Sequence, residues 1–90
     1  MTRKADPSSA TGWLFLGLAR FDANDRNGAE SAAHRALALD PRSGRSLILL
    51  ASVYLDAGQR PQAEMELRRY LELEPEGQYA EEARQLLIER

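Results

Sequence analysis

His34, the single histidine of the chain, is the residue best suited to acid–base chemistry. It lies between Ala33 and Arg35 in an alanine-rich stretch, and no motif supplies a serine or cysteine nucleophile. A catalytic base must be paired and oriented before it can work. Phosphate-binding loops and zinc-ligand spacings are missing from the sequence, and the absence of cysteine excludes thiolate metal sites. We therefore predict no enzyme activity, metal or cofactor, and interpret His34 as a surface or packing residue.

Acidic residues gather in the second half of the chain and alternate with Arg68 and Arg69; they are Glu64, Glu66, Glu72, Glu74 and Glu76. Glu64 and Arg68 have the i, i+4 spacing of a helical ion pair, which favours a solvated helix. An acidic surface for a basic partner is the alternative. The 12 basic and 14 acidic residues leave a net charge of −2, with no concentrated basic face, so nucleic-acid binding is not expected.

The apolar run GWLFLGLARF, residues 12–21, is too short for a membrane span, which needs ~20 apolar residues. Arg3 and Lys4 precede it, as in a signal peptide, but Asp6, Pro7 and two serines intervene and no Ala-x-Ala cleavage pattern follows. We expect neither secretion nor membrane insertion, and slightly favour the cytoplasm. The preference for arginine over lysine hints at a bacterial source.

A period of 34 residues organises the chain. Pro7, Pro41 and Pro75 lie 34 residues apart, and each follows an acidic residue. The same offset aligns Ala29-Glu30 with Ala63-Glu64, and further leucines and arginines besides. A fixed period of this size indicates a stacked repeat.

Each repeat is predicted to be a pair of antiparallel helices, giving an all-α fold. The prolines suit first helical turns, so we expect helices over 7–22, 29–39, 41–56 and 61–73, with turns at 22–28 and 57–61. Gly58 suits the left-handed conformation after a helix end. The organisation predicted is a flexible segment 1–6, repeats 7–40 and 41–74, and a capping helix within 75–90. That last helix has one apolar face, formed by Tyr79, Ala80, Ala83, Leu86 and Leu87.

At this spacing the chain resembles the tetratricopeptide repeat over residues 7–75. The matching residues of the first repeat are Trp13, Leu16, Gly17, Ala29, Ala36 and Pro41. Those of the second are Leu47, Leu50, Ala51, Tyr54, Ala63, Leu67 and Pro75. Three positions depart from the family pattern: Arg20 replaces a tyrosine, Ala33 a bulky residue and Tyr70 an alanine. Small residues such as Gly17 and Ala63 stand where paired helices approach closely.

The resemblance implies a right-handed superhelix whose first helices line a concave groove. On the first helix, Leu14, Leu18 and Phe21 form one stripe at i, i+4 and i+7. The stripe and its counterpart in the second repeat predict a partner-binding groove lined by Leu14, Leu18, Phe21, Arg45, Ile48, Ser52 and Leu55. An apolar groove of this kind takes a partner helix or an extended apolar segment. The alternative is that the stripe simply packs on the neighbouring helix.

A second and a third stripe occupy the remaining faces of the first helix. Trp13, Leu16 and Gly17 are expected to face the second helix of their own repeat. Phe15 and Ala19 are expected to face the place of a preceding repeat, which a longer array or a second copy of the chain would fill. An uncovered patch of this kind marks an interaction site.

Relatives that clamp the carboxylates at chaperone C-termini use lysine and asparagine in the groove. This chain has Leu14, Leu18 and Leu49 there, and Arg45 alone does not make such a clamp. We therefore predict a non-catalytic scaffold or adaptor that binds a peptide or helix of another protein. The alternative is a homodimer, or a piece of a longer array, in which the first helix is buried by another repeat.

Overall fold

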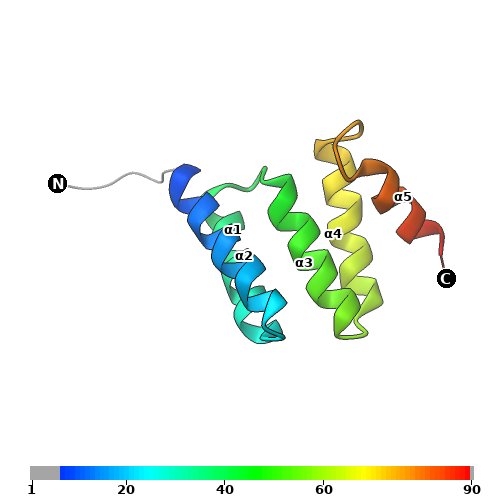
Figure 1. The fold of residues 1–90 in the computed structure, drawn as a ribbon. Helices are drawn as coiled ribbons and strands as arrows, with labels where there is room; N and C mark the ends of the chain where they lie inside the picture. Colours follow the sequence, from blue (N-terminus) through cyan, green and yellow to red (C-terminus); the bar gives the residue numbers. More distant parts are fainter. Residues whose placement is uncertain (1–6, 90) are drawn as a thin grey trace.

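The computed structural model describes residues 7–89, and it describes side chains from Ser9 onward. This part of the chain is all-α and holds five helices: α1 (Pro7–Asp22), α2 (Arg26–Leu39), α3 (Gly44–Asp56), α4 (Arg60–Leu73) and α5 (Ala80–Ile88). Each helix packs against the next one along the chain, so the helices follow one another in a row (Figure 1). None of the helices described is long and apolar enough to cross a membrane. The predicted flexible segment, residues 1–6, lies outside the described residues.

Two helices begin at other residues than expected, because a capping side chain fixes the first residue of each. The α2 helix begins at Arg26, three residues before the expected Ala29, because Asp25 is its N-cap. The Asp25 carboxylate accepts a hydrogen bond from the Gly28 N–H at 2.9 Å, which satisfies one free donor of the first turn.

The prediction that Pro41 begins a helix is wrong. Pro41 lies in a turn, and α3 begins at Gly44 after its N-cap Ser43, whose hydroxyl accepts from the Ser46 N–H. By contrast, Pro61 lies in the first turn of α4, where its missing N–H is harmless. Gly58 has a φ of 75°, which confirms the left-handed residue expected after α3.

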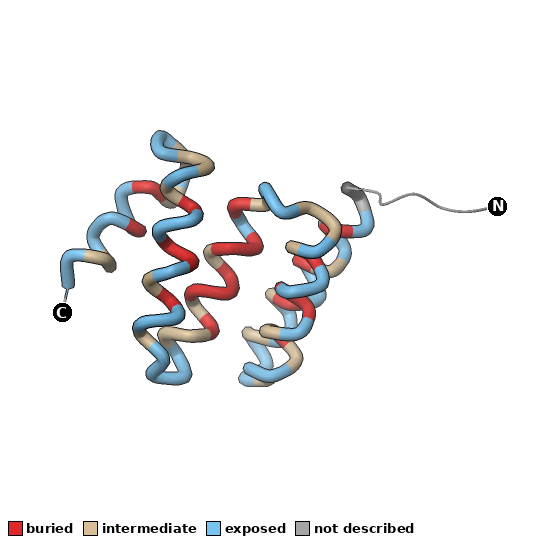
Figure 2. Tube along the Cα trace, turned by 180° about the vertical axis from the view of Figure 1, so that it is seen from behind, coloured by how far each residue is buried: buried red, intermediate tan, exposed pale blue. Residues whose placement is uncertain are grey.

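The α3 helix lies at the centre of the core and is buried along most of its length (Figure 2). One side of α3 joins Leu14 of α1 and three alanines of α2 in an apolar cluster. Its other side joins Leu67 and Tyr70 of α4 and two alanines of α5 in a second cluster. Small residues permit this packing, since a Cβ atom on Gly17 would lie 2.7 Å from Leu49 Cδ2 and 3.3 Å from Ala32 Cβ.

Tyr70, which departs from the family pattern, is the largest fully buried side chain and is 1% exposed. Gly44 and Gly77 make room for it, because a Cβ atom at either position would collide with the Tyr70 ring or hydroxyl. The Tyr70 hydroxyl accepts a hydrogen bond from the Tyr79 N–H at 2.9 Å, and the two rings meet edge to face, 6.1 Å apart. The tyrosine therefore ties α4 to the residue that precedes α5.

The α5 helix is attached at both ends. At its beginning, Ala80 and Ala83 are buried in the second cluster. At its end, the Arg60 guanidinium donates to the carbonyl oxygens of Leu86 and Glu89, an arrangement that suits the negative end of a helix dipole.

Candidate functional site

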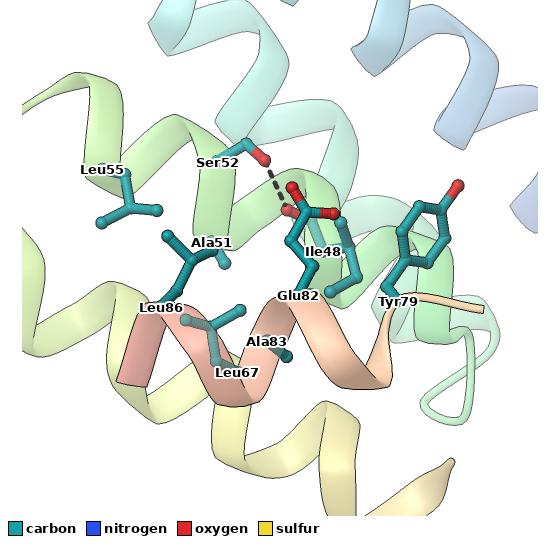
Figure 3. Close-up of a pocket in the computed structure, with 9 residues that line it drawn as sticks. All are labelled: Ile48, Ala51, Ser52, Leu55, Leu67, Tyr79, Glu82, Ala83 and Leu86. Carbon is teal, nitrogen blue, oxygen red and sulfur yellow. Dashed lines mark hydrogen bonds between the residues drawn. The ribbon is translucent and has the colours of Figure 1, made fainter. Parts of the chain in front are cut away.

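Two hollows lie side by side along α1, α3 and α5. The α1–α3 hollow has a volume of about 160 Å³ and is lined by Leu14, Leu18, Phe21, Arg45, Ile48, Leu49, Ser52 and Tyr79. The α3–α5 hollow has a volume of about 240 Å³ and is lined by Ile48, Ala51, Ser52, Leu55, Leu67, Tyr79, Glu82, Ala83 and Leu86 (Figure 3). Because Ile48, Ser52 and Tyr79 line both, the hollows form one groove.

All seven residues predicted for the groove line it, at Leu14, Leu18, Phe21, Arg45, Ile48, Ser52 and Leu55. They are not equally open to a partner. Leu14 is 5% exposed and belongs to the core, so it forms the floor of the α1–α3 hollow. Leu18 and Phe21 are half-buried and pack on that core while lining the hollow. Leu18 and Phe21 therefore do both things that were considered for this stripe: they line the groove and they pack on the core.

The α5 helix and its N-cap supply groove residues that the sequence interpretation missed, since it favoured a capping role for this helix over a ligand-binding one. Tyr79, Glu82 and Leu86 stand beside Ile48 and Leu55 of α3 (Figure 3). The sequence could have indicated these residues, because Tyr79, Glu82 and Leu86 lie 34 positions after the groove residues Arg45, Ile48 and Ser52.

Exposed apolar side chains form a second surface on α1. We call the exposed Phe15, Leu16 and Ala19, together with the half-buried Trp13, the α1 outer face. Phe15 is 53% and Leu16 39% exposed, whereas the residues 34 positions later, Leu49 and Leu50, are 3% and 1% exposed. The difference arises because α1 and α2 cover α3, and no described helix covers α1 in the same way.

The expected packing of α1 on α2 is seen directly at Gly17. Gly17 approaches Ala32 and the backbone of Ala29 on α2. Trp13 also meets α2, where the Arg35 guanidinium lies 5.0 Å from its ring centroid. Leu16 is 39% exposed and lines a shallow hollow with Ser9, Gly12 and Trp13.

The groove carries one charge of each sign. Arg45 lines the α1–α3 hollow, and its guanidinium lies 5.6 Å from the centroid of the Phe15 ring on the α1 outer face, a cation–π contact between α3 and α1. Glu82 lies at the α3–α5 hollow. Among the described residues neither side chain forms an ion pair.

Within residues 7–89, two groups have a clearly shifted pKa, and both lie outside the groove. The hydrogen bond from the Gly28 N–H, together with Arg20, lowers the pKa of Asp25. Burial and the neighbouring Glu30 carboxylate raise the pKa of Tyr54, whose hydroxyl donates to Glu30 at 3.2 Å. Both groups therefore serve the fold.

His34 and the ion-paired Glu64 lie apart from the groove. His34 is exposed on α2, with its Nε2 3.5 Å from a Glu30 carboxylate oxygen. Glu64 pairs with Arg68 at 3.5 Å, as the spacing predicts, and also with Arg60 at 3.0 Å. Over residues 7–89, histidine and carboxylate side chains nowhere form a group that would hold a metal ion.

A family model described as tetratricopeptide repeat matches residues 20–87, from the end of α1 into the last turn of α5. Repeats of this family generally mediate protein–protein interactions and are generally not catalytic. The comparison with curated proteins gave no match. Since the matched segment is well over half of the 90 residues and the helices form stacked pairs, the chain belongs to the tetratricopeptide repeat family.

Proposed function

We propose that the chain is a non-catalytic scaffold or adaptor that binds a segment of another protein in the groove along α1, α3 and α5. The observation that carries the proposal is the continuity of the two hollows through Ile48, Ser52 and Tyr79. Their lining is mainly aliphatic and aromatic, as in surfaces that take apolar side chains of a partner helix or strand. The two hollows follow one another along the helices, a shape that suits successive side chains of a partner segment.

Ser52 is the best position at which to test the groove. It lines both hollows, is half-buried, and makes one hydrogen bond, from its hydroxyl to the Ile48 carbonyl oxygen at 2.9 Å. Arginine at this position obstructs both hollows and removes no apolar group from the core. Met65 on α4 is 59% exposed and lines neither hollow, so Met65→Arg adds the same side chain elsewhere.

The experiment is affinity capture from extract of the source cell with the wild-type chain, Ser52→Arg and Met65→Arg. We expect a partner protein that wild type and Met65→Arg retain and Ser52→Arg loses, with all three chains equally folded by circular dichroism. Retention of every captured protein by folded Ser52→Arg would contradict groove binding.

Self-association through the α1 outer face is the second candidate. The supporting observation is that the equivalent residues of α3 are buried by a neighbouring helix pair, whereas Phe15 and Leu16 are exposed. An apolar patch of this kind commonly marks an interface. Light scattering after gel filtration distinguishes the candidates: a dimer that Phe15→Asp dissociates supports self-association, and a monomer at high concentration rejects it.

A further inference from the structure

The α5 helix occupies the position of the first helix of a third repeat. The 34-residue offset that relates α1 to α3 also relates Arg45, Ile48 and Ser52 to Tyr79, Glu82 and Leu86, and all six residues line the groove. The groove therefore has three walls, and its central wall, α3, separates hollows of different charge.

Tyr79 lines both hollows, and contacts with Tyr70 hold it in position. Its N–H donates to the buried Tyr70 hydroxyl, and its ring packs against the Tyr70 ring. The Tyr79 hydroxyl makes no hydrogen bond within the described residues, and in Figure 3 the side chain points away from α5, toward the side on which α1 lies. A partner backbone that crosses from one hollow to the other meets this hydroxyl.

The charges of the groove are divided between its two ends. Arg45 is at the α1–α3 hollow, and Glu82 is at the α3–α5 hollow. Both are exposed, and neither is neutralised by an ion pair within residues 7–89. Charges arranged in this way select a partner of complementary pattern more than they add affinity.

From this arrangement, and resting on the proposed function, we infer that the partner is an amphipathic segment with two apolar anchor side chains and a defined order of charges. One anchor enters the α1–α3 hollow beside an acidic side chain that pairs with Arg45. The other enters the α3–α5 hollow beside a basic side chain that pairs with Glu82. The groove thus recognises an acid–apolar–apolar–base pattern and discriminates against the same segment with its charges exchanged.

The test uses a library of random 12-residue peptides displayed on phage. Peptides retained by the wild-type chain and lost by Ser52→Arg bind the groove. The tightest of them is synthesised in its selected form and with its acidic and basic residues exchanged. Binding of both forms is measured by fluorescence polarisation.

Two charge-exchanged proteins of unchanged net charge complete the design. The first, Arg45→Glu/Glu82→Arg, reverses the charges of the groove. The control, Arg42→Glu/Glu81→Arg, reverses exposed charges on neighbouring residues that line neither hollow. Both place an arginine in the first turn of α5, so their effect on the dipole of α5 is matched.

We expect the exchanged peptide to bind wild type and the control about tenfold more weakly than the selected peptide, and the preference to reverse for Arg45→Glu/Glu82→Arg. Added salt shrinks the difference, because exposed charges are screened. Groove-dependent peptides that bind equally in both forms overturn the charge pattern and leave the proposed function intact. The absence of any peptide that Ser52→Arg loses overturns both.

Discussion

Gly17 is the position where close helix packing is most open to measurement. A Cβ atom there would lie 2.7 Å from Leu49 Cδ2, 3.3 Å from Ala32 Cβ and 3.4 Å from the Ala29 carbonyl oxygen. The atoms of Ala29 and Ala32 are fixed by the α2 backbone, so Leu49 must move, and Leu49 is only 3% exposed. Overpacking of this kind costs about 1–3 kcal/mol.

Alanine also favours a helix more than glycine does, by about 0.5–1 kcal/mol. Gly17→Ala is therefore expected to lower the free energy of unfolding by up to about 2.5 kcal/mol after this gain is subtracted. Gly12 provides the matched control, since it lies in the same helix and a Cβ atom there meets nothing within 4 Å. Gly12→Ala is expected to raise the free energy of unfolding by about 0.5–1 kcal/mol.

The assay is urea unfolding followed by circular dichroism and by Trp13 fluorescence, with linear extrapolation to water. The m-values of the two variants should agree with that of wild type, so that the midpoints report stability. Gly17→Leu exaggerates the overpacking and should prevent folding. Equal stabilisation by Gly17→Ala and Gly12→Ala would refute the close approach of α1 to α2 and α3.

Three further predictions concern α2, α4 and α5. Because the folded state lowers the pKa of Asp25, its carboxylate stabilises the fold above the ordinary aspartate pKa, and this contribution disappears as pH falls through the folded-state pKa. The thermal midpoints of wild type and Asp25→Asn should therefore approach each other as the solution is acidified below the ordinary aspartate pKa, and a gap independent of pH would contradict the assignment. Tyr70→Phe leaves the Tyr79 N–H without its acceptor. It should lower the free energy of unfolding by about 1 kcal/mol and Tm by about 4–8 °C, and should speed hydrogen exchange in α5. Unchanged exchange would show that this hydrogen bond does not hold α5. Ala63→Leu inserts a branched side chain at a position that is 0% exposed. It should unfold the chain or lower the free energy of unfolding by about 1–3 kcal/mol, measured by urea unfolding. A variant as stable as wild type would mean that α3 and α4 are less tightly packed.

The helix pairs and most groove residues were predictable because they depend on spacing. The 34-residue period and the i, i+4, i+7 stripe are properties of the sequence alone, and they led to Leu18, Phe21, Ile48 and Leu55. The start of α3 was missed because Ser43 competes with Pro41 to begin the helix. A serine hydroxyl that binds a backbone N–H there outweighs the preference of proline for a first turn.

The role of α5 was less predictable, because an amphipathic pattern shows that a helix has one apolar face and does not say how many neighbours share that face. Leu86 lines the groove and also packs on the core with α4. The exposure of Leu16 depends on what lies beside α1, which no spacing within that helix reveals. Tyr70 was counted as a departure from the family pattern, and only the positions of Gly44 and Gly77 explain how it fits.

Site-specific photo-cross-linking in the source cell tests the central claim most directly. A benzophenone amino acid is placed, one position at a time, at Ser52 in the groove, at Leu16 on the α1 outer face and at Met65 on α4. Groove binding predicts a covalent adduct with another protein from Ser52 and none from Met65. Adducts from Met65 alone, or adducts from Leu16 alone that join two copies of the chain, would contradict it.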